Sequence, residues 1–282
     1  MSQRISILMT CHNRRQNTIE CLAALNRAII SVEGIDPKII LVDDESTDGT
    51  ADAVKSAFPA VKLIRGDGNL FWNKGMIKAW QAAQELESDF YLWLNDDTNL
   101  QSDSLQTLLA DSLSKKHESI ICGVCESGDR TSISYSGYLL KHKQRLKPDG
   151  LPMLCDYFNG NVVLVPKHVY DVVGLLDPFY RHTLGDVDYG LRAKDLGIMS
   201  FISSKVVAVC DRHQSLPIWC NPAYHLRQRL RHFKTPLAKN PREIFYFEKR
   251  HTGLFMAIFR ATIIYIRLIF PKLWIIIGKA QI

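Results

Sequence analysis

The 282-residue sequence lacks the glycine patterns that identify the commonest nucleotide-binding loops. The segment after the first apolar run, "TCHNRRQNT", contains no glycine at all. The glycine-containing stretch "GDGNLFWNKG" (66–75) fits neither the GxGxxG nor the GxxxxGK[ST] spacing. These absences exclude the dinucleotide-binding fingerprint and the P-loop. They also disfavour a sugar-nucleotide pyrophosphorylase, because such an enzyme requires a glycine-rich basic loop after its first strand.

Cysteine is present in an odd number, seven, and the residues are widely scattered. The pair Cys122 and Cys125 has CxxC spacing, but no second pair or nearby histidine completes a zinc site. We therefore expect reduced structural thiols rather than a disulfide framework, as in a cytoplasmic protein. The first residues, "MSQRISILMTCHNRR", contain no long apolar region before a small-residue cleavage site, so we expect no signal peptide.

Long uninterrupted apolar runs are missing as well. The stretch 254–277 is apolar but is interrupted by Arg260, Arg267, Pro271 and Lys272, which leaves segments too short to span a bilayer. Basic and aromatic residues on such helices suit an amphipathic tail lying on an anionic inner-membrane surface. The alternative is a set of helices that pack on the domain or on a homodimer partner.

Positive charge is concentrated at the C-terminal end, and the net charge is +6. From Arg227 onward the only acidic residues are Glu243 and Glu248. The basic residues of this part are Arg227, Arg229, Arg231, Lys234, Lys239, Arg242, Lys249, Arg250, Arg260, Arg267, Lys272 and Lys279. Nucleic acid fits this charge, but the sequence contains no recognition module for it, so we expect no nucleic-acid partner.

Strand-like and helix-like segments alternate in the first half of the chain. The predicted strands are 4–10, 38–44, 61–65 and 90–95, and the predicted helices are about 14–31, 50–58, 73–87 and 103–115. Strands separated by helices of this length predict a doubly wound, Rossmann-like α/β sheet that is mostly parallel. In the second half we expect strands at 132–140, 160–165 and 201–209, helices at 166–174 and 186–196, and a helical, basic region after His213.

The predicted strands end in polar clusters: "TCHN", "DDEST", "RGDGN" and "NDDTN". Ligands of doubly wound sheets bind beyond the carboxyl ends of the strands, so these clusters indicate a nucleotide-sized site. In "FYLWLNDDTN" (90–99), a buried strand is followed at once by Asp96 and Asp97. Mg²⁺ or Mn²⁺ often uses only one or two carboxylates and takes phosphate oxygens for the rest of its shell. The alternative is that Asp97 and Thr98 only cap the next turn.

Two further segments carry carboxylates. Asp43 and Asp44 end the second strand, where one of them can accept hydrogen bonds from a ribose or base, although turn formation is the competing role. Asp186 and Asp188 begin a predicted helix. Because Arg192 lies four residues after Asp188, we expect these two to pair, which leaves Asp186 to accept a proton.

Together, these motifs resemble those of the family 2 glycosyltransferases, which are inverting enzymes of the GT-A fold that use nucleotide-diphospho-sugars. The residues that carry the resemblance are "ILMTCHNR", "LVDDESTDGT", "GNLFWNKG", "WLNDDT", "GDVDYGLRAKDLG" and the later His213. The resemblance covers roughly residues 4–215. It looks strongest to bacterial enzymes that build O-antigen, capsule or related surface polysaccharides, including rhamnosyltransferase-like members.

The resemblance implies a role for each matching residue. Asp186 would be the catalytic base, and Asp97 and His213 would contact the metal, Mn²⁺ or Mg²⁺. The nucleotide-sugar would be bound by Thr10, Asp43, Asp44, Asn69, Trp72 and Asp96. It also implies a GT-A domain over 1–215, with a nucleotide-sugar half (1–100) and an acceptor half (101–215), followed by a basic amphipathic helical tail over 216–282.

The expected partners are a nucleotide-diphospho-sugar donor, a glycan or lipid-linked acceptor and the inner face of the plasma membrane. Two positions depart from the family pattern. Asn95 stands first in the acidic motif, and Gly185 precedes the expected base where the family commonly has Glu. A non-catalytic partner that binds sugar nucleotide or membrane in an assembly complex is therefore the alternative function.

Overall fold

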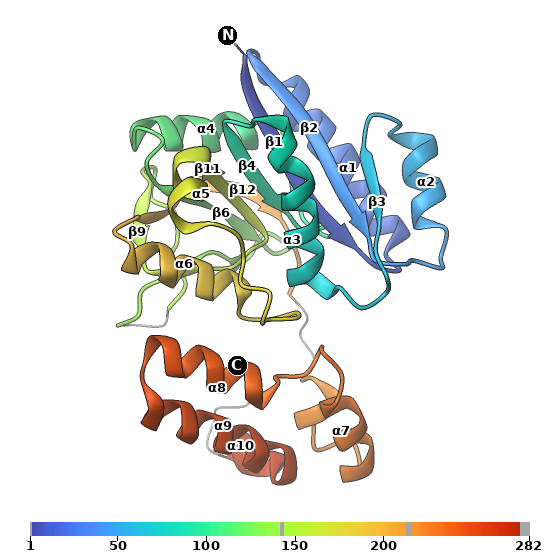
Figure 1. The fold of residues 1–282 in the computed structure, drawn as a ribbon, viewed down its shortest axis with the longest axis vertical. Coiled ribbons are helices and arrows are strands. Elements are labelled where there is room, and N and C mark those ends of the chain that lie inside the picture. Colours follow the sequence, from blue (N-terminus) through green and yellow to red (C-terminus); the bar gives the residue numbers. More distant parts are fainter. Residues whose placement is uncertain (1, 142–143, 213–215, 277–282) are drawn as a thin grey trace. The chain divides into compact units, whose positions relative to one another are not determined.

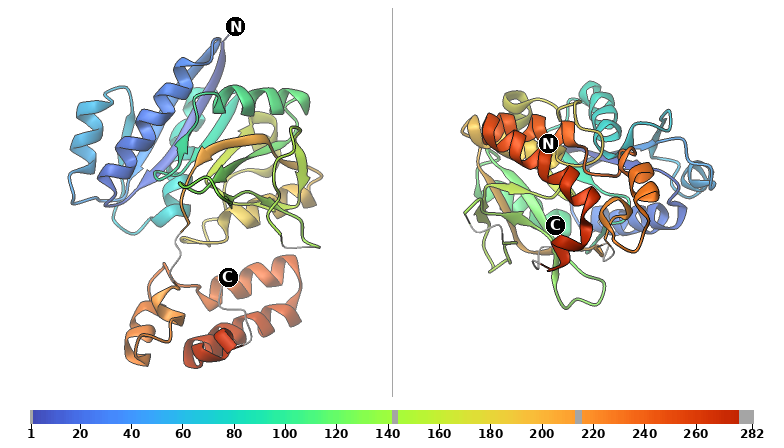
Figure 2. Two further views of the ribbon diagram at one scale, coloured as in Figure 1. Left: turned by 180° about the vertical axis from the view of Figure 1, so that it is seen from behind. Right: turned by 90° about the horizontal axis from the view of Figure 1, so that it is seen from below.

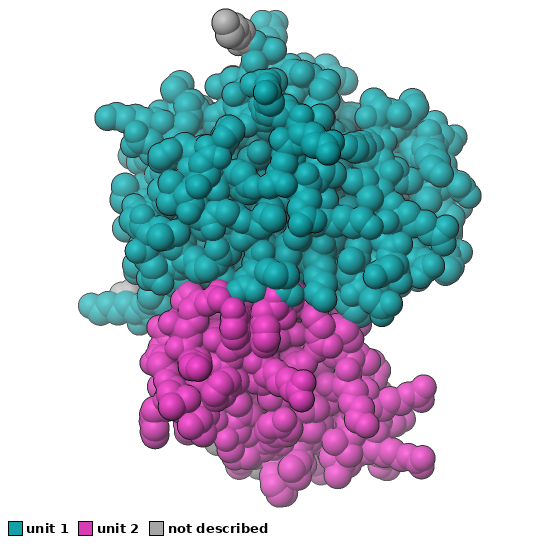
Figure 3. Space-filling view, in the orientation of Figure 1, with its two compact units in different colours: residues 1–178, 185–212 teal, residues 179–184, 213–282 magenta. Residues whose placement is uncertain are grey.

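The computed structural model of the chain describes residues 2–141, 144–212 and 216–276. The chain divides into two compact units, which Figure 3 colours separately: unit 1, residues 1–178 and 185–212, and unit 2, residues 179–184 and 213–282. The short segment 179–184 thus groups with the C-terminal helices although helix α6 (Gly185–Asp195) follows it in sequence.

Unit 1 is built on one large sheet (Figure 1). Its strands are β1 (Gln3–Cys11), β2 (Ile35–Asp43), β3 (Lys62–Arg65), β4 (Phe90–Leu94), β5 (Asn99–Leu100), β6 (Ile120–Glu126), β7 (Ile133–Tyr135), β9 (Met153–Cys155), β11 (Val162–Pro166) and β12 (Ser200–Val209). The strand order is β3-β2-β1-β4-β11-β6-β12-β5, with β7 beside β6 and β9 beside β12. The strands β8 (Gly137–Tyr138) and β10 (Tyr157–Phe158) form a separate small pair.

The predicted parallel arrangement is confirmed for the first half of the chain. Strands β3, β2, β1 and β4 are parallel neighbours. Along the main path only β11 and β5 run against the rest, because β11 pairs antiparallel with both β4 and β6. The antiparallel direction of β11 follows from its connection, which returns through the small strand pair instead of a crossover helix.

Helices cover both faces of the sheet (Figures 1 and 2). One face carries α1 (Arg15–Ile30), α2 (Thr50–Ala57) and α4 (Ser104–Ser114), and the other carries α3 (Phe71–Ala83), α5 (Lys167–Val173) and α6 (Gly185–Asp195). Side chains of β1 alternate between the two layers: Ile7 and Met9 pack with Leu22 of α1, whereas Leu8 packs with Trp80 of α3. The sheet is therefore buried on both sides, which explains the nearly unbroken apolar strands in the sequence.

The carboxyl ends of the parallel strands meet along one edge. The register pairs Cys11 with Asp43, and Asp43 with Arg65. It also pairs Leu8 with Trp93, so β4 ends level with β1. The loops that follow β1, β2, β3 and β4 consequently emerge side by side, as the polar clusters in the sequence predicted.

Unit 2 is helical, as expected from the sequence. After a short 3-10 turn (Ile218–Cys220) it contains α7 (Leu226–Phe233), α8 (Pro241–His251), α9 (Leu254–Ile269) and α10 (Pro271–Ile276). Asn240 caps α8 by accepting from the backbone N–H of Arg242, with Pro241 at the first helical position. The small core of unit 2 consists of Trp219, Cys220, Ala238, Ile264 and Leu268. Across the described part of the chain, no helix combines the length and the apolar character needed to cross a membrane.

Candidate active site

An arginine lies between the two adjacent carboxylates at the end of β4. Nη1 of Arg14 donates to Asp97 Oδ2 over 2.7 Å and to Asp96 Oδ1 over 3.0 Å. Arg14 is the residue before α1, so the loop after β1 brings its side chain across to the loop after β4. The guanidinium thus places a positive charge between two neighbouring carboxylates, with charge-assisted hydrogen bonds to both.

Asp96 is the more buried member of the pair, with 5% of its surface exposed. The pKa of Asp96 is raised to about 6, chiefly by burial and also by the charge of Asp97, against the opposing effect of Arg14. Its second oxygen, Oδ2, is buried and has no hydrogen-bond partner among the described residues. Asp96 is thus held by one contact on one oxygen, with the other oxygen available to a ligand.

Asp97 is partly exposed, and its geometry suits a divalent cation. Its Oδ1 contacts only a weak donor, the Cys210 thiol, at 3.7 Å. Within the described residues, no group of three or more His, Cys, Asp or Glu side chains is arranged to hold a metal. One or two carboxylates completed by phosphate oxygens are the usual Mg²⁺ or Mn²⁺ site in nucleotide enzymes. The donor set of Asp97 and Asp96 therefore fits a metal that arrives with a diphosphate.

The structure separates the roles of Asp43 and Asp44. Both oxygens of Asp44 are used by backbone N–H groups: Oδ1 accepts from Gly68 over 2.8 Å, and Oδ2 accepts from Leu70 and Phe71 at 2.9 and 3.0 Å. Asp44 thereby holds the 66–70 loop and the first turn of α3. Asp43 accepts one side-chain bond within the described residues, from Ser46 N to its Oδ1, and its Oδ2 is not used in this way.

The loops after β1 and β2 are joined by short polar contacts. His12 Nδ1 lies 2.6 Å from the Asp44 carbonyl, and Asn13 Oδ1 accepts from Thr47 N over 2.7 Å. Thr10 is buried beneath them against α3, where a Cβ on Gly75 would lie 2.3 Å from its Oγ1. Asn69 is exposed at the tip of the 66–70 loop and bonds only to Asp67. The expected nucleotide residues therefore line one edge, with Thr10 beneath it.

A continuous set of contacts joins the acidic motif to the predicted base. Nε1 of Trp72 donates to Asn95 Oδ1 over 2.7 Å. A Cβ on Gly160 would lie 2.7 Å from the Trp72 ring and 3.1 Å from the Cβ of Asp186. Gly160 N in turn donates to Asp186 Oδ2 over 2.8 Å. Asn95, Trp72 and Gly160 thus connect the carboxylate pair with Asp186, and the amide at position 95 orients the indole.

Asp186 lies in the first turn of α6. It accepts from Gly160 N and, through Oδ1, from Val187 N over 2.9 Å. Burial raises the pKa of Asp186 above its ordinary value, and these two N–H donors limit the increase. A carboxylate whose pKa lies above that of an exposed aspartate is a better proton acceptor, provided that it remains ionised at the working pH.

Neighbouring residues explain two features of α6 noted in the sequence, the pairing of Asp188 and the glycine at position 185. Asp188 is fully buried and pairs with Arg192 Nε over 2.8 Å, which confirms the predicted i, i+4 pair. A Cβ at Gly185 would lie 1.9 Å from Asn73 Oδ1. Asn73, which donates to the Asp177 carbonyl, therefore fills the space that a side chain at position 185 would enter.

One predicted site residue cannot be placed, and two residues of the site were not predicted. The predicted metal contact His213 lies outside the described residues. Sequence reasoning did not identify Arg14 or Gly160. A signal for Arg14 was present, because the two acidic residues required a cation and "NRR" follows the neighbouring strand. Gly160 offered no comparable signal, since its importance lies in a close approach that only the fold creates.

All seven cysteines are free and buried, as predicted from their number and spacing. Cys21 Sγ donates to the carbonyls of Asn95 and Thr98, beneath the acidic motif. Burial and the nearby Asp97 raise the pKa of Cys210 to about 12, so its thiol is protonated at neutral pH. These thiols are packing groups and weak donors, not nucleophiles.

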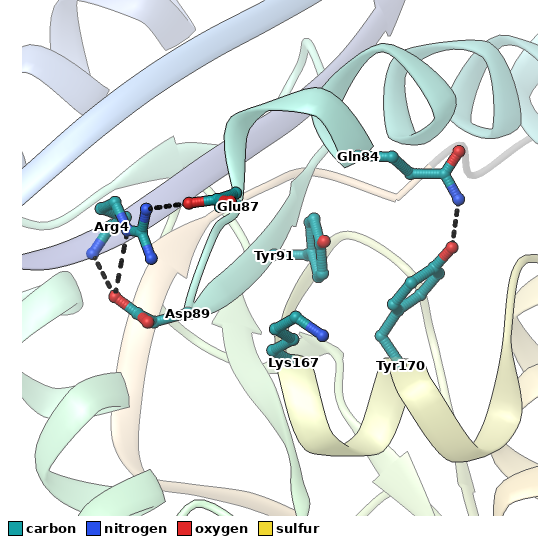
Figure 4. A pocket seen from close by; sticks show the side chains of 7 residues that line it. All are labelled: Arg4, Gln84, Glu87, Asp89, Tyr91, Lys167 and Tyr170. Atoms are coloured by element: carbon teal, nitrogen blue, oxygen red, sulfur yellow. Dashed lines mark hydrogen bonds and ion pairs between the residues drawn. The ribbon is translucent and has the colours of Figure 1, made fainter.

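A separate hollow of about 350 Å³ lies at the opposite, amino-terminal end of β1 and β4 (Figure 4). It is lined by Arg4, Gln84, Glu87, Asp89, Tyr91, Lys167 and Tyr170. Arg4 pairs with Glu87 at 3.1 Å and lies 3.9 Å from Asp89. Gln84 bonds to Tyr170. Because its polar groups are largely paired with one another, and because it lies away from the carboxyl ends, we assign it no role in the site.

Solved structures with the same architecture are glycosyltransferases of the GT-A fold. S. aureus TarS 1–349 in complex with UDP-GlcNAc matches with a TM-score of 0.59 and 13% identity over 88% of this chain. This chain spans 65% of that TarS segment. Mannosyltransferase PcManGT from Pyrobaculum calidifontis, in complex with GDP-Man and Mn²⁺, matches with a TM-score of 0.56 and 15% identity, over 94% of this chain and 74% of that one. At these identities the likeness establishes the fold.

The family is established by sequence. The family Glycosyl transferase family 2 matches residues 6–162, more than half of the 282-residue chain. The chain belongs to this family, and the resemblance expected from its motifs is confirmed. No curated protein sequence matches the chain significantly.

Proposed function

We propose that this family 2 glycosyltransferase is metal-dependent and inverting, and that it moves a hexosyl or deoxyhexosyl group from a nucleotide-diphospho-sugar to a hydroxyl of a lipid-linked glycan. The observation that carries the proposal is the set of contacts from Asp97 through Asn95, Trp72 and Gly160 to Asp186. It joins a carboxylate pair suited to a metal–diphosphate with a carboxylate suited to accept a proton. The TarS and PcManGT structures, which hold UDP-GlcNAc and GDP-Man with Mn²⁺, support a nucleotide-sugar donor.

The donor would lie along the edge formed by the loops after β1 to β4. Asp43 would accept a hydrogen bond from the base or ribose through its second oxygen. Asp97 would hold the divalent cation, Mn²⁺ or Mg²⁺, which when bound neutralises charge on the leaving diphosphate. Arg14 would hold Asp97 in position, and Trp72 would form a wall beside the sugar ring.

Asp186 would act as the general base. It would take the proton from the acceptor hydroxyl as the hydroxyl oxygen forms its bond to the anomeric carbon. The bond from that carbon to the diphosphate oxygen breaks on the opposite face, which inverts the configuration. The hydrogen bonds from Gly160 and Val187 would hold the carboxylate in the orientation needed for this attack.

The character of unit 2 supports the proposed acceptor and location. Basic residues and exposed apolar side chains occur together on its helices. This combination suits a protein that works at the inner face of the plasma membrane, peripheral to it, where a lipid-linked acceptor for bacterial surface polysaccharide is held. His213 remains a proposed metal or diphosphate contact, and Asn69 a proposed donor contact.

A donor-hydrolysis screen tests the proposal. UDP-, GDP- and dTDP-sugars would be incubated with Mn²⁺ or Mg²⁺, and released nucleotide measured for the wild type and Asp97→Ala. We expect metal-dependent release from one donor, reduced at least about a hundredfold in the variant because the ion loses its carboxylate. Release that is absent for every donor, together with no metal-dependent nucleotide binding, would contradict the proposal. Nucleotide binding that persists with no transfer to a lipid-linked acceptor would favour a non-catalytic partner.

A further inference from the structure

Helix α9 buries Ala257, Ile264 and Leu268, the last two in the core of unit 2, and it also carries apolar side chains on its outward side. Buried positions on this helix include Arg267, which is 3% exposed, while Phe255 is 81% exposed. The outward apolar side chains are Leu254, Phe255, Ile258, Phe259, Tyr265, Ile266 and Ile269. A helix whose outward side meets only water carries polar residues on that side. This face therefore needs an apolar environment.

A groove of about 390 Å³ lies at the C-terminal end of α9, between α7, α9 and α10. Its apolar lining includes Ile269, Phe270 and Leu273, which continue the outward face of α9. Two cations line the same groove, Arg229 from α7 and Lys272 from α10. The groove thus combines an apolar rim with positive charge, the two properties of a phosphate-bearing lipid site.

Arg229 is 8% exposed. Its Nη1 donates to the Leu268 carbonyl over 2.6 Å, which accounts for one donor as a cap of α9. Its Nε is buried and has no hydrogen-bond partner within the described residues, and no carboxylate there lies within ion-pair distance. A buried charge without a counter-charge is strongly disfavoured unless a ligand supplies one.

Unit 2 contains only two acidic residues, Glu243 and Glu248, against a much larger number of cations. Burial and the neighbouring Arg267 lower the pKa of Lys239 to about 8. The acidic side chains Glu243 and Glu248 are already in ion pairs, with Arg181 at 2.7 Å and Arg260 at 3.8 Å. An external anion would therefore balance the charge that this unit carries in its interior.

We infer that this groove binds the phosphate headgroup of an anionic membrane lipid. Arg229 and Lys272 contact the phosphate, while Phe270, Leu273 and the outward face of α9 enter the acyl region. The inference rests on the membrane-surface part of the proposed function, and not on sugar transfer itself. It assigns a specific lipid site to a unit whose charge alone would indicate only diffuse attraction.

Vesicle sedimentation with the full chain tests this site. The probes are phosphatidylcholine vesicles with and without about 30 mol% phosphatidylglycerol. We expect Lys272→Gln to weaken binding to the anionic vesicles about fivefold, the effect of one lysine at such a surface. The matched control is Lys249→Gln, an exposed lysine of α8 outside the groove that removes the same charge. Equal losses in both variants would overturn the site in favour of diffuse attraction.

Two further comparisons separate the apolar contribution and the competing ligands. Phe270→Ser should weaken vesicle binding, and Leu237→Ser should not, although both side chains are exposed, at 61% and 58%. Inorganic phosphate that binds as tightly as the vesicles would overturn the lipid assignment. So would a dimer that Phe270→Ser abolishes, measured by sedimentation velocity. Donor hydrolysis by the same variants, measured without vesicles, should stay at the wild-type level, so failure of the lipid site and failure of the transferase are distinguishable.

Discussion

Arg14 Nη1 lies 2.7 Å from Asp97 Oδ2 and thereby ties the loop after β1 to the loop after β4. The same atom bonds to Asp96, so a single guanidinium serves both carboxylates. Asp97 keeps its Oδ1 for another ligand while this contact is made. The carboxylate pair is therefore held in place by the protein itself.

Replacing Arg14 by Gln should destabilise the fold and increase its response to metal. The change leaves two adjacent carboxylates without their cation, which should lower the free energy of unfolding by about 1–2 kcal/mol, a modest value because Arg14 is partly solvated. Millimolar Mn²⁺ should restore more stability to this variant than it adds to the wild type, since the ion replaces the lost charge. Urea unfolding at pH 7, with and without Mn²⁺, measures both effects.

The matched control is Arg15→Gln, which removes the same charge one residue away. Arg15 is exposed and makes no contact with the acidic pair. Its loss should change stability by less than about 0.5 kcal/mol and leave the Mn²⁺ response unaltered. Equal effects of the two variants would show that Arg14 acts only through net charge.

The neighbouring aspartates of β2 should respond differently to the same substitution. Asp44→Asn replaces a carboxylate that accepts three backbone N–H bonds, so we expect a loss of about 1–3 kcal/mol in unfolding free energy. Asp43→Asn should lose less stability but weaken nucleotide binding about tenfold, because it removes an acceptor for the base or ribose. Urea unfolding and calorimetric titration with nucleotide compare the two. The opposite pattern would exchange the roles that we assign.

Asp186→Asn should abolish most of the chemistry while donor binding persists. Loss of a general base lowers kcat about 10²–10⁴-fold, with little change in the KM for the donor. Because burial raises the pKa of Asp186, wild-type kcat/KM should fall on acidification at a higher pH than an exposed aspartate would give. The residual activity of the variant should lack this acidic limb. A variant that retains the limb would place the base elsewhere.

The stability of the protein should also depend on the ionisation of Asp96. Its pKa rises from 3.8 to about 6 on folding, so the folded state binds this proton more tightly than the unfolded state. The stability contributed by the protonated form is therefore complete below pH 3.8 and lost as the pH increases to about 6. This amounts to about 2–3 kcal/mol. Asp96→Asn should remove this decrease in unfolding free energy, which urea unfolding between pH 4 and 7 measures. If the free energy of the variant falls with pH as steeply as that of the wild type, the titration belongs to another group.

A side chain at position 185 should be tolerated only if Asn73 is made smaller. A Cβ there would lie 1.9 Å from Asn73 Oδ1, so Gly185→Ala should destabilise the protein by about 1–3 kcal/mol. Asn73→Gly on its own should also destabilise, since it removes the bond to the Asp177 carbonyl. The double variant should be more stable than the sum of the two single losses predicts. A double-mutant cycle measured by thermal unfolding tests this, and strict additivity would contradict the steric explanation.

The sequence predicted the elements of unit 1 because their physical signals are local. Apolar runs and helical periodicity located β1 to β4 and the helices between them to within a few residues. The polar ends of those strands predicted where Asp43 and Asp96 would meet, because parallel strands share one carboxyl edge. The pairing of Asp188 with Arg192 likewise needed only the spacing of a helix.

Contacts between distant segments were not predictable in this way. Nothing local indicates that Gly160 approaches both Trp72 and Asp186, or that Asn73 occupies the space next to Gly185. The choice between Asp43 and Asp44 also depended on a tertiary feature, the backbone N–H groups that the 66–71 segment presents to Asp44. Close packing selects such arrangements, and pattern alone does not encode them.

The burial of every native cysteine has a practical consequence for studying this enzyme in solution. Thiol-reactive dyes and spin labels react with thiolates at accessible positions, and all seven native thiols are buried. A single cysteine introduced at an exposed position, for example by Ile30→Cys, would then be the residue that carries the label. Fluorescence or electron-resonance distances to a labelled donor or vesicle are therefore accessible in the native background, without prior removal of any cysteine.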